Sequence, residues 1–335
     1  MTTERPRVSF LVPTLNAAAL LPQALASIRR QAYPQDRVEI IVADGGSDDD
    51  TRALARSLFE ARVVENPNRL AEFGVKEAML ASRADLVVIF AADNELVGDK
   101  WLDRIANRFE GDERLAAVYG RLVSGDEDPA LNKYVELIQS DPLNWFLNRN
   151  LDDYLAIGTE GSDGGVVFEV DPGRPVIWGA NGLVLRADWA RPHWSRNGYV
   201  ADVDAFHAMV RAGHARVVYY PQAFCYHHQV ATLGDMRRKW IRNSRGHLFA
   251  QAGDRNLDWV AVRGFRLRMG LWLVYSLVPI ISLGDALRRA FATGSRHWLY
   301  HPAASFLQTV TYVEALVRDP AGRRLLRSLF GRRHR

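Results

Sequence analysis

The sequence predicts an α/β protein with a doubly wound, mostly parallel sheet and a C-terminal helical extension. From residue 7 to 124, short apolar runs alternate with amphipathic segments, which is typical of parallel strands joined by right-handed crossover helices. Two of the early strands end in polar turn residues at 13–16 and 44–48. In such sheets ligands bind at the carboxyl ends of the strands. Beyond residue 268 long apolar stretches replace the alternation.

The elements follow in order along the chain. Strands are expected at 7–13, 38–43, 62–65, 84–91 and 115–123, and helices at 17–31, 49–60, 71–82 and 99–109. Later segments give mixed helix signals at 130–150, a Gly/Asp-rich hairpin or loop at 158–175, a helix at 202–212 and a strand at 216–228. This later section is expected to complete the sheet.

The C-terminal part is apolar and ends in a basic tail. Residues 269–283 are almost wholly apolar but span fewer than the ~20 residues of a bilayer crossing, and Pro279 interrupts them. A second apolar stretch covers 298–317. Three readings stay open for these segments: helices on or in a membrane, a dimer interface, or buried helices. If they lie on a membrane, truncation after about residue 265 should leave a soluble, nucleotide-binding protein.

The basicity of the chain belongs to its end. Residues 320–335 hold six arginines and no acid, and without those arginines the formal net charge of +4 becomes −2. The tail suits an anionic membrane surface or is a solvated terminus, and nucleic acid is not expected as a partner. The single Cys225 cannot form an internal bridge, and the N-terminus lacks a signal-peptide apolar region. We therefore expect a cytoplasmic protein, peripheral or monotopic at the inner face of the cell membrane.

The first candidate site combines two turns about thirty residues apart. A carboxylate at Asp44 can accept hydrogen bonds from a base N–H, and Gly45 lets the backbone approach a flat ligand. Together with the Pro-Thr-Leu-Asn turn, this segment resembles the nucleotide half of the family 2 inverting glycosyltransferases, which have the GT-A fold. The resemblance implies that Asp44, Gly45, Pro13, Thr14 and Asn16 bind the donor nucleotide. The alternative is that residues 44–47 form only a turn and a helix cap.

The second candidate is a metal site. The expected strand 84–91 leads into Ala91-Ala92-Asp93, where the family has an Asp-x-Asp motif, so the first aspartate is missing and Asp93 is kept. A divalent cation held there, Mn²⁺ or Mg²⁺, would neutralise a diphosphate leaving group. Glu95 offers another carboxylate, and the resemblance implies His227 as a further metal or diphosphate ligand. The alternative for Asp93 is a cap for the following helix.

The acceptor side is inferred from three further segments. Asp202 and Asp204 match the family's Glu-Asp-x-Asp stretch, with Ala201 in place of the glutamate. An inverting transfer needs one base opposite the leaving group, and Asp202 is the candidate. The resemblance also suggests an acceptor loop and a basic segment over the diphosphate. These residues are Trp178, Gly179, Asn181 and Asp204 on the acceptor side, and Arg242 and Arg245 at the diphosphate.

The predicted function is sugar transfer. The resemblance covers roughly residues 6–246, with 1–124 as the nucleotide-binding half, 125–246 as the acceptor-side half and 247–335 as the helical extension. It implies transfer from a nucleoside diphosphate sugar, first of all a UDP-sugar, to a hydroxyl of a lipid-linked or polysaccharide acceptor. The alternative function is a non-catalytic module that binds sugar nucleotides or glycans. A homodimer is possible as the assembly. A nucleotidyltransferase would need glycine and basic residues after the first strand, and residues 11–22 contain neither.

Overall fold

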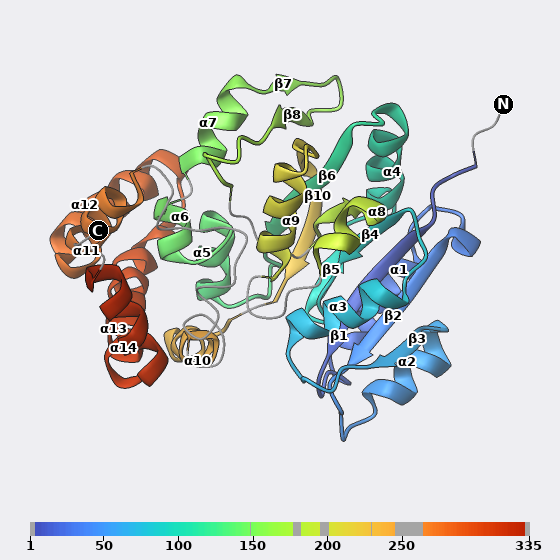
Figure 1. The fold of residues 1–335 in the computed structure, drawn as a ribbon, viewed down its shortest axis with the longest axis horizontal. Helices are drawn as coiled ribbons and strands as arrows, with labels where there is room; N and C mark the ends of the chain where they lie inside the picture. Colours follow the sequence, from blue (N-terminus) through green and yellow to red (C-terminus); the bar gives the residue numbers. More distant parts are fainter. Residues whose placement is uncertain are drawn as a thin grey trace. The chain divides into compact units, whose positions relative to one another are not determined.

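The computed structural model describes residues 4–147, 149–176, 182–194, 201–228, 230–244 and 264–331. The chain divides into two compact units (Figure 1). The first unit consists of Met1–Gly125 and Asn150–His228, and the second of Asp126–Arg149 and Gln229–Arg335.

The first unit is built on a ten-stranded sheet in the described part of the chain. The strands are β1 (Val8–Thr14), β2 (Val38–Asp44), β3 (Arg62–Glu65), β4 (Leu86–Ile89), β5 (Asn94–Leu96), β6 (Leu115–Val123), β7 (Thr159–Glu160), β8 (Val166–Glu169), β9 (Val184–Arg186) and β10 (Arg216–His227). Their order is β3-β2-β1-β4-β9-β6-β10-β8-β7, and β5 pairs with β10. The pairs β3–β2, β2–β1, β1–β4 and β6–β10 are parallel, and β9 runs antiparallel to β4 and β6.

Alternation along β1 divides the core between the two faces of the sheet. Val8, Phe10 and Val12 belong to one buried cluster, and Leu11 belongs to the other, as expected for a strand covered on both faces. The first face is covered by α1 (Leu21–Arg29), α2 (Thr51–Phe59) and α4 (Trp101–Gly111). The second is covered by α3 (Ala71–Ala81), α8 (Ala187–Ala190) and α9 (Ala201–Arg211), with Tyr154 of α7 (Arg149–Ile157) in the same cluster.

The predicted α/β fold with a helical C-terminal region is confirmed. Strands 62–65 and 115–123 have the predicted bounds, and the 158–175 segment forms the β7–β8 hairpin. Helix 17–31 begins only at Leu21, because residues 16–18 bond to the neighbouring turn instead. The antiparallel β9 in the middle of the sheet was not predicted, since three residues are too few to show a period.

The second unit is helical. Its elements are α5 (Ala130–Ile138), α6 (Pro142–Leu147), α10 (Leu233–Asn243), α11 (Phe265–Leu277), α12 (Pro279–Thr293), η4 (Arg296–Tyr300), α13 (His301–Arg318) and α14 (Pro320–Gly331). One buried cluster joins Leu131 and Tyr134 of α5 to Trp240 of α10, Trp298 of η4 and Ala304 of α13. The structure therefore divides the chain elsewhere than at 246: α5 and α10 pack with the C-terminal helices, because their apolar faces share that core.

The length and composition of the described helices show whether one of them could cross a membrane. Among the described helices, none alone is long and apolar enough to span a bilayer. Helices α11 and α12 meet the length and composition criteria only as a pair, and their axes are bent by 89° at the break between them.

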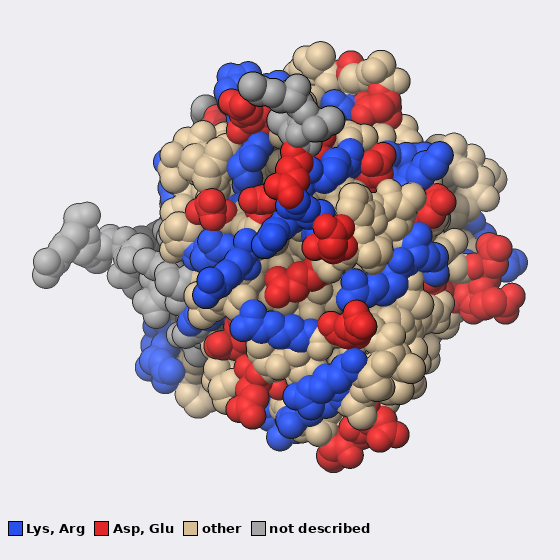
Figure 2. Space-filling model, turned by 90° about the vertical axis from the view of Figure 1, so that its right-hand side faces the viewer, with Lys and Arg blue, Asp and Glu red and all other residues tan. Residues whose placement is uncertain are grey.

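Charge is mixed over the face shown in Figure 2. Acidic and basic side chains alternate there, without a continuous region of one sign. This distribution is that of an ordinary solvated protein surface.

Candidate active site

The candidate site lies at the carboxyl edge of the sheet, where the strand order reverses. Strand β1 pairs in parallel with β2 as far as Thr14 and Asp44, and with β4 as far as Leu11 and Ile89. The segments after β1, β2 and β4 therefore leave the sheet at the same edge. Ligands of open α/β sheets bind at such a switch point, and most of the predicted donor residues lie here.

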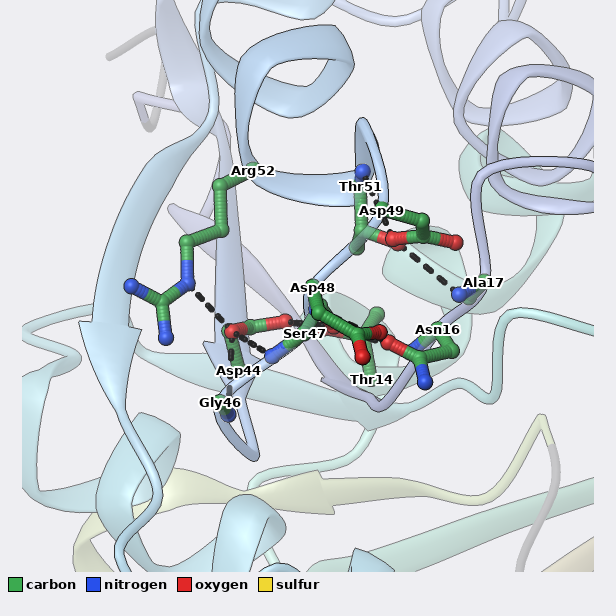
Figure 3. Close-up of polar contacts among 10 residues, drawn as sticks. All are labelled: Thr14, Asn16, Ala17, Asp44, Gly46, Ser47, Asp48, Asp49, Thr51 and Arg52. Carbon is green, nitrogen blue, oxygen red and sulfur yellow. Dashed lines mark hydrogen bonds and ion pairs between the residues drawn. The ribbon is translucent and has the colours of Figure 1, made fainter.

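Asp44 accepts hydrogen bonds from several groups at this edge (Figure 3). Its side chain is only 1% exposed. One carboxylate oxygen accepts hydrogen bonds from Gly46 N (3.1 Å), Ser47 N (2.9 Å) and Arg52 Nε, and the other accepts from Thr14 Oγ1 (3.1 Å) and Ser47 Oγ (2.5 Å). Burial alone would raise the pKa of Asp44, but the hydrogen bonds from Ser47 and Arg52 outweigh it and hold the pKa below its ordinary value. The carboxylate is ionised and fixes the turn.

The turns after β1 and β2 also bond directly to each other. Asn16, whose φ is +52°, donates its backbone N–H to Ser47 Oγ (2.8 Å) and accepts from Asp48 N at its side-chain oxygen (3.0 Å). Asp49 accepts from Ala18 N (3.0 Å) with one oxygen and from Thr51 with the other. Figure 3 shows these contacts apart from that of Ala18, which it does not draw. Two loops that each arise from a separate strand thus form one pre-arranged rim.

Close packing explains the glycine and proline at this edge. A Cβ on Gly45 would lie 3.1 Å from Arg69 Cα and 3.3 Å from Thr14 O. Pro13 is buried against α3, where a Cβ on Gly74 would come within 2.8 Å of the proline ring. Pro13 therefore supports the rim from beneath, whereas Asn16 is exposed on it.

Sequence reasoning overlooked Arg69. This residue is exposed at the same edge, after β3, and its φ is +64°. Such a backbone costs a non-glycine residue about 1–3 kcal/mol and often marks a functional position. Its Cα lies beside Gly45. No residue pattern distinguishes it, because the signal is a backbone angle rather than a side-chain type.

Asp93 and His227 are brought together as predicted. Asp93 Oδ2 lies 3.7 Å from His227 Nε2, and the buried Asp93 Oδ1 has no hydrogen-bond partner among the described residues. The loop that carries Asp93 is fixed by the buried Asn94, which accepts from Ala91 N (2.9 Å) and donates to Tyr226 O (3.2 Å). Backbone pairing continues this tie, since Asp93 O accepts from His228 N (3.1 Å).

Glu95 points elsewhere. It lies on β5, and its two carboxylate oxygens accept hydrogen bonds from Gln23 Nε2 of α1 and from Nη2 of Arg30, the residue after α1, both at 2.6 Å. These bonds occupy the carboxylate in joining β5 to α1. It does not take the place of the missing first aspartate of the motif.

The Asp93–His227 pair fits a divalent cation with few protein ligands. No group of three or more His, Cys, Asp or Glu side chains capable of holding a metal occurs in the described residues. A cation that keeps waters and substrate phosphates as ligands needs only one or two side chains. A carboxylate oxygen without a hydrogen-bond partner, beside an imidazole, supplies that set.

The remaining predicted residues lie on α9 and α10 or outside the described residues. Asp202 is half-buried and Asp204 is buried, and both lie in the first turn of α9. The helix dipole stabilises a carboxylate at that position. Arg242 is exposed in the last turn of α10, in the second unit. The predicted positions Trp178, Gly179, Asn181 and Arg245 lie outside the described residues.

Several curated relatives match about a third of this chain. Glycosyltransferase AglE of Haloferax volcanii is 24% identical over 115 residues, covering 33% of this chain and 38% of that protein. A PGL/p-HBAD biosynthesis glycosyltransferase of Mycobacterium tuberculosis is 34% identical over 125 residues, covering 35% and 47%. O-antigen chain rhamnosyltransferase RfbN of Salmonella typhimurium is 30% identical over 119 residues, covering 34% and 37%. The chain thus spans less than half the length of each relative.

The fold is shared with a solved transferase. A mannosyltransferase of Pyrobaculum calidifontis, in complex with GDP-Man and Mn²⁺, matches with a TM-score of 0.55 and 20% identity, covering 92% of this chain and 87% of that chain. The likeness confirms the expected GT-A fold. The profile of Glycosyl transferase family 2 matches residues 9–164, which include Asp44 and Asp93. By this match and by its relatives, residues 9–164 form a glycosyl transferase family 2 domain.

Proposed function

We propose that this protein transfers a sugar from a nucleoside diphosphate sugar to a hydroxyl group of its acceptor, with inversion at the anomeric carbon. The observation that carries the proposal is the carboxyl edge of the sheet. There a pre-arranged rim around Asp44 follows the neighbouring strands β1 and β2, and Asp93, after the next strand β4, lies 3.7 Å from His227 at the end of β10. A rim and a cation site on one edge suit the two ends of a nucleoside diphosphate.

The proposed chemistry is a single displacement. Asp202 takes the proton of the acceptor hydroxyl while that oxygen forms a bond to the anomeric carbon. The bond from the anomeric carbon to the diphosphate breaks, and the nucleoside diphosphate leaves with the electron pair. Asp93 and His227 would hold a divalent cation, which would supply charge compensation for that leaving group. Asp204, buried in the same helical turn, orients the segment that carries Asp202.

UDP-sugars are the first donors to test, with GDP-mannose as the main alternative. The solved transferase of similar fold carries GDP-Man, and this supports testing both nucleotides. The acceptor is proposed to be a lipid-linked or polysaccharide hydroxyl, because relatives are named for O-antigen chain and PGL/p-HBAD biosynthesis.

The test measures nucleotide release from each UDP- and GDP-sugar, with and without Mn²⁺. Release is expected with one nucleotide and only with the cation. Asp93→Ala should abolish the Mn²⁺ dependence of nucleotide binding, measured by calorimetry. Glu95→Gln is the matched control two residues away, and it should keep that dependence because its carboxylate is bonded to α1.

Two results would count against the proposal. Binding of nucleotide sugar without any release, with all acceptors tried, would favour the non-catalytic binding module. Equal Mn²⁺ dependence in Asp93→Ala and the wild type would remove the cation site from this edge.

A further inference from the structure

The outer face of helices α11 to α13 is apolar. Of twenty-one exposed large hydrophobic residues among the described residues, sixteen lie between Leu267 and Val317. Ile280 and Phe291 are 76% and 86% exposed. Scattered exposed hydrophobics are ordinary, but a contiguous group of this size marks an interaction surface.

The inner face of the same helices consists mostly of small and hydroxyl-bearing residues. On α11 and α12 the buried positions are Trp272, Ser276, Ser282 and Ala286. The buried positions of α13 include Ser305, Gln308, Thr309 and Thr311. A helix of a water-soluble protein has the opposite pattern, with its apolar stripe facing the core. The large apolar side chains of these helices therefore face outward, where a water-soluble protein would place polar ones.

Hydrogen bonds stabilise this inverted packing. Thr309 Oγ1 donates to Ser276 Oγ (2.8 Å) between α13 and α11. Gln308 Nε2 donates to Asp141 Oδ1, and its oxygen accepts from Leu143 N, both at 2.8 Å. Small and hydroxyl residues between helices, with hydrogen bonds across them, are typical of helices that pack while their outer faces contact lipid.

The bend between α11 and α12 has an uncharged apex. Residues 269–284 carry no charged side chain. At the apex Val278 and Ile281 are exposed together with Ile280. From residue 278 back to 269 the helix rises about 14 Å, which is close to half of the ~30 Å hydrocarbon core. With its 89° bend, the pair is long enough to enter one leaflet.

Positive charge surrounds the apex. Arg266 and Arg268 precede the uncharged segment. After it come Asp285 and the two arginines that pair with it, Arg288 and Arg289, so the flanks carry a net positive charge. Residues 264–331 contain nine arginines and three acidic residues. Anionic lipid headgroups complement this charge. A second copy of the chain would not, because a two-fold interface through the apex would bring arginines against arginines.

We propose that the α11–α12 bend inserts into one leaflet of an anionic lipid bilayer, with the flanking arginines at the headgroups. The protein is then monotopic, held by the exposed apolar side chains of α11, α12 and α13. This inference stands on the second unit alone and does not depend on the proposed sugar transfer.

The experiment is vesicle flotation of the full chain. Phosphatidylcholine vesicles with phosphatidylglycerol should carry the protein, and high salt should weaken but not abolish binding, since salt screens only the arginines. The double variant Ile280→Ser/Phe291→Ser should bind at least tenfold more weakly. The matched control Leu58→Ser/Ile157→Ser changes residues that are 60% and 73% exposed in the first unit, and it should bind as the wild type does.

Insertion itself is measured with a fluorophore attached at Ile280→Cys. Its emission should shift to the blue with anionic vesicles and be quenched by nitroxide-labelled lipid, whereas the same label at Leu58→Cys should show neither change. The proposal is overturned if the wild type ignores anionic vesicles. It is equally overturned if the chain is a dimer that Ile280→Ser/Phe291→Ser dissociates while vesicle binding stays unchanged.

Discussion

At the residue scale, Asp44 shows how a ligand-binding motif also serves the fold. The sequence around Asp44 is compatible with a nucleotide contact or with a turn and a helix cap. In the structure the carboxylate accepts hydrogen bonds from Thr14, Gly46, Ser47 and Arg52. Those bonds hold the turn, so we expect Asp44 to affect nucleotide binding through the geometry of the rim. The groups that face solvent there, such as Asn16 and Arg69, are the better candidates for direct contact with the donor.

Asp202 is predicted to be the base. Asp202→Asn keeps the shape and removes the basicity, so turnover should fall by roughly 10² to 10⁴ while donor affinity stays within about twofold. Steady-state kinetics and nucleotide calorimetry measure the two quantities. Asp188→Asn, an exposed carboxylate on α8, is the control. Near-normal turnover in Asp202→Asn would remove this residue from the mechanism.

Arg69 is predicted to contact the donor nucleotide, and its strained backbone conformation is predicted to place its side chain for that contact. Arg69→Gly relieves the positive φ, so the free energy of unfolding should stay equal or rise by up to about 1 kcal/mol. Affinity for the nucleoside diphosphate should fall, because the guanidinium is gone. Urea unfolding and calorimetry on the same variant separate the two effects. Unchanged affinity would make Arg69 a residue of the turn alone.

His207 makes stability depend on pH. Burial lowers the pKa of His207 from 6.5 to about 4, and its Nε2 lies 2.9 Å from Val176 O. Between these two pKa values the unfolded chain binds a proton that the folded protein does not, so stability falls as pH drops. From pH 7 to pH 5 the loss is about 2 kcal/mol.

The measurement compares the wild type with His207→Gln, which keeps a donor for the Val176 carbonyl. At pH 8 His207 is neutral in both the folded and the unfolded wild type. Any difference in the free energy of unfolding between the wild type and the variant at that pH therefore reports packing alone. The variant should lose about 2 kcal/mol less than the wild type between pH 7 and pH 5. Identical pH slopes in urea unfolding would contradict the assignment.

At the scale of elements, long periodic segments were predictable and short ones were not. The strands β1, β2 and β6 show clear apolar runs, and their bounds agree with the sequence to within a residue. Strands β5 and β9 have three residues each, which is too short for a period. Their positions are set by pairing, with β9 held between β4 and β6. Such long-range partners are not encoded in a local pattern.

The site was predictable to the same extent. The Asp44 turn and the Asp93–His227 pair were predictable because each residue directly follows or ends a strand, and parallel strands share an edge. Arg69 and the engagement of Glu95 with α1 were not, because they depend on a backbone angle and on side-chain direction. Local sequence thus predicts which edge holds the site, and packing decides which side chains remain available on it.

At the scale of the whole molecule, the second unit is assembled from two separate parts of the chain. Residues Asp126–Arg149 and Gln229–Arg335 form it together. The sequence predicts the C-terminal helices as a separate extension, but in the structure they share a core with an earlier part of the chain. They complete a core to which α5 contributes Leu131, Tyr134, Val135 and Ile138, from a segment inserted in the sheet-forming half.

This arrangement changes the expected outcome of truncation. A chain that ends at residue 264 loses Trp298 and Ala304 from the α5 core, and Tyr134 loses its 2.8 Å hydrogen bond with His301. Each large apolar side chain so exposed costs roughly 1.5–3 kcal/mol, so α5 and α6 should unfold and the protein should aggregate. A chain that ends at residue 331 keeps the core and is the control. Light scattering and urea unfolding distinguish the cases: the shorter chain should be polydisperse with a lowered midpoint, and the control should match the wild type. A monomeric shorter chain with the wild-type midpoint would mean that α5 and α6 fold without the C-terminal helices.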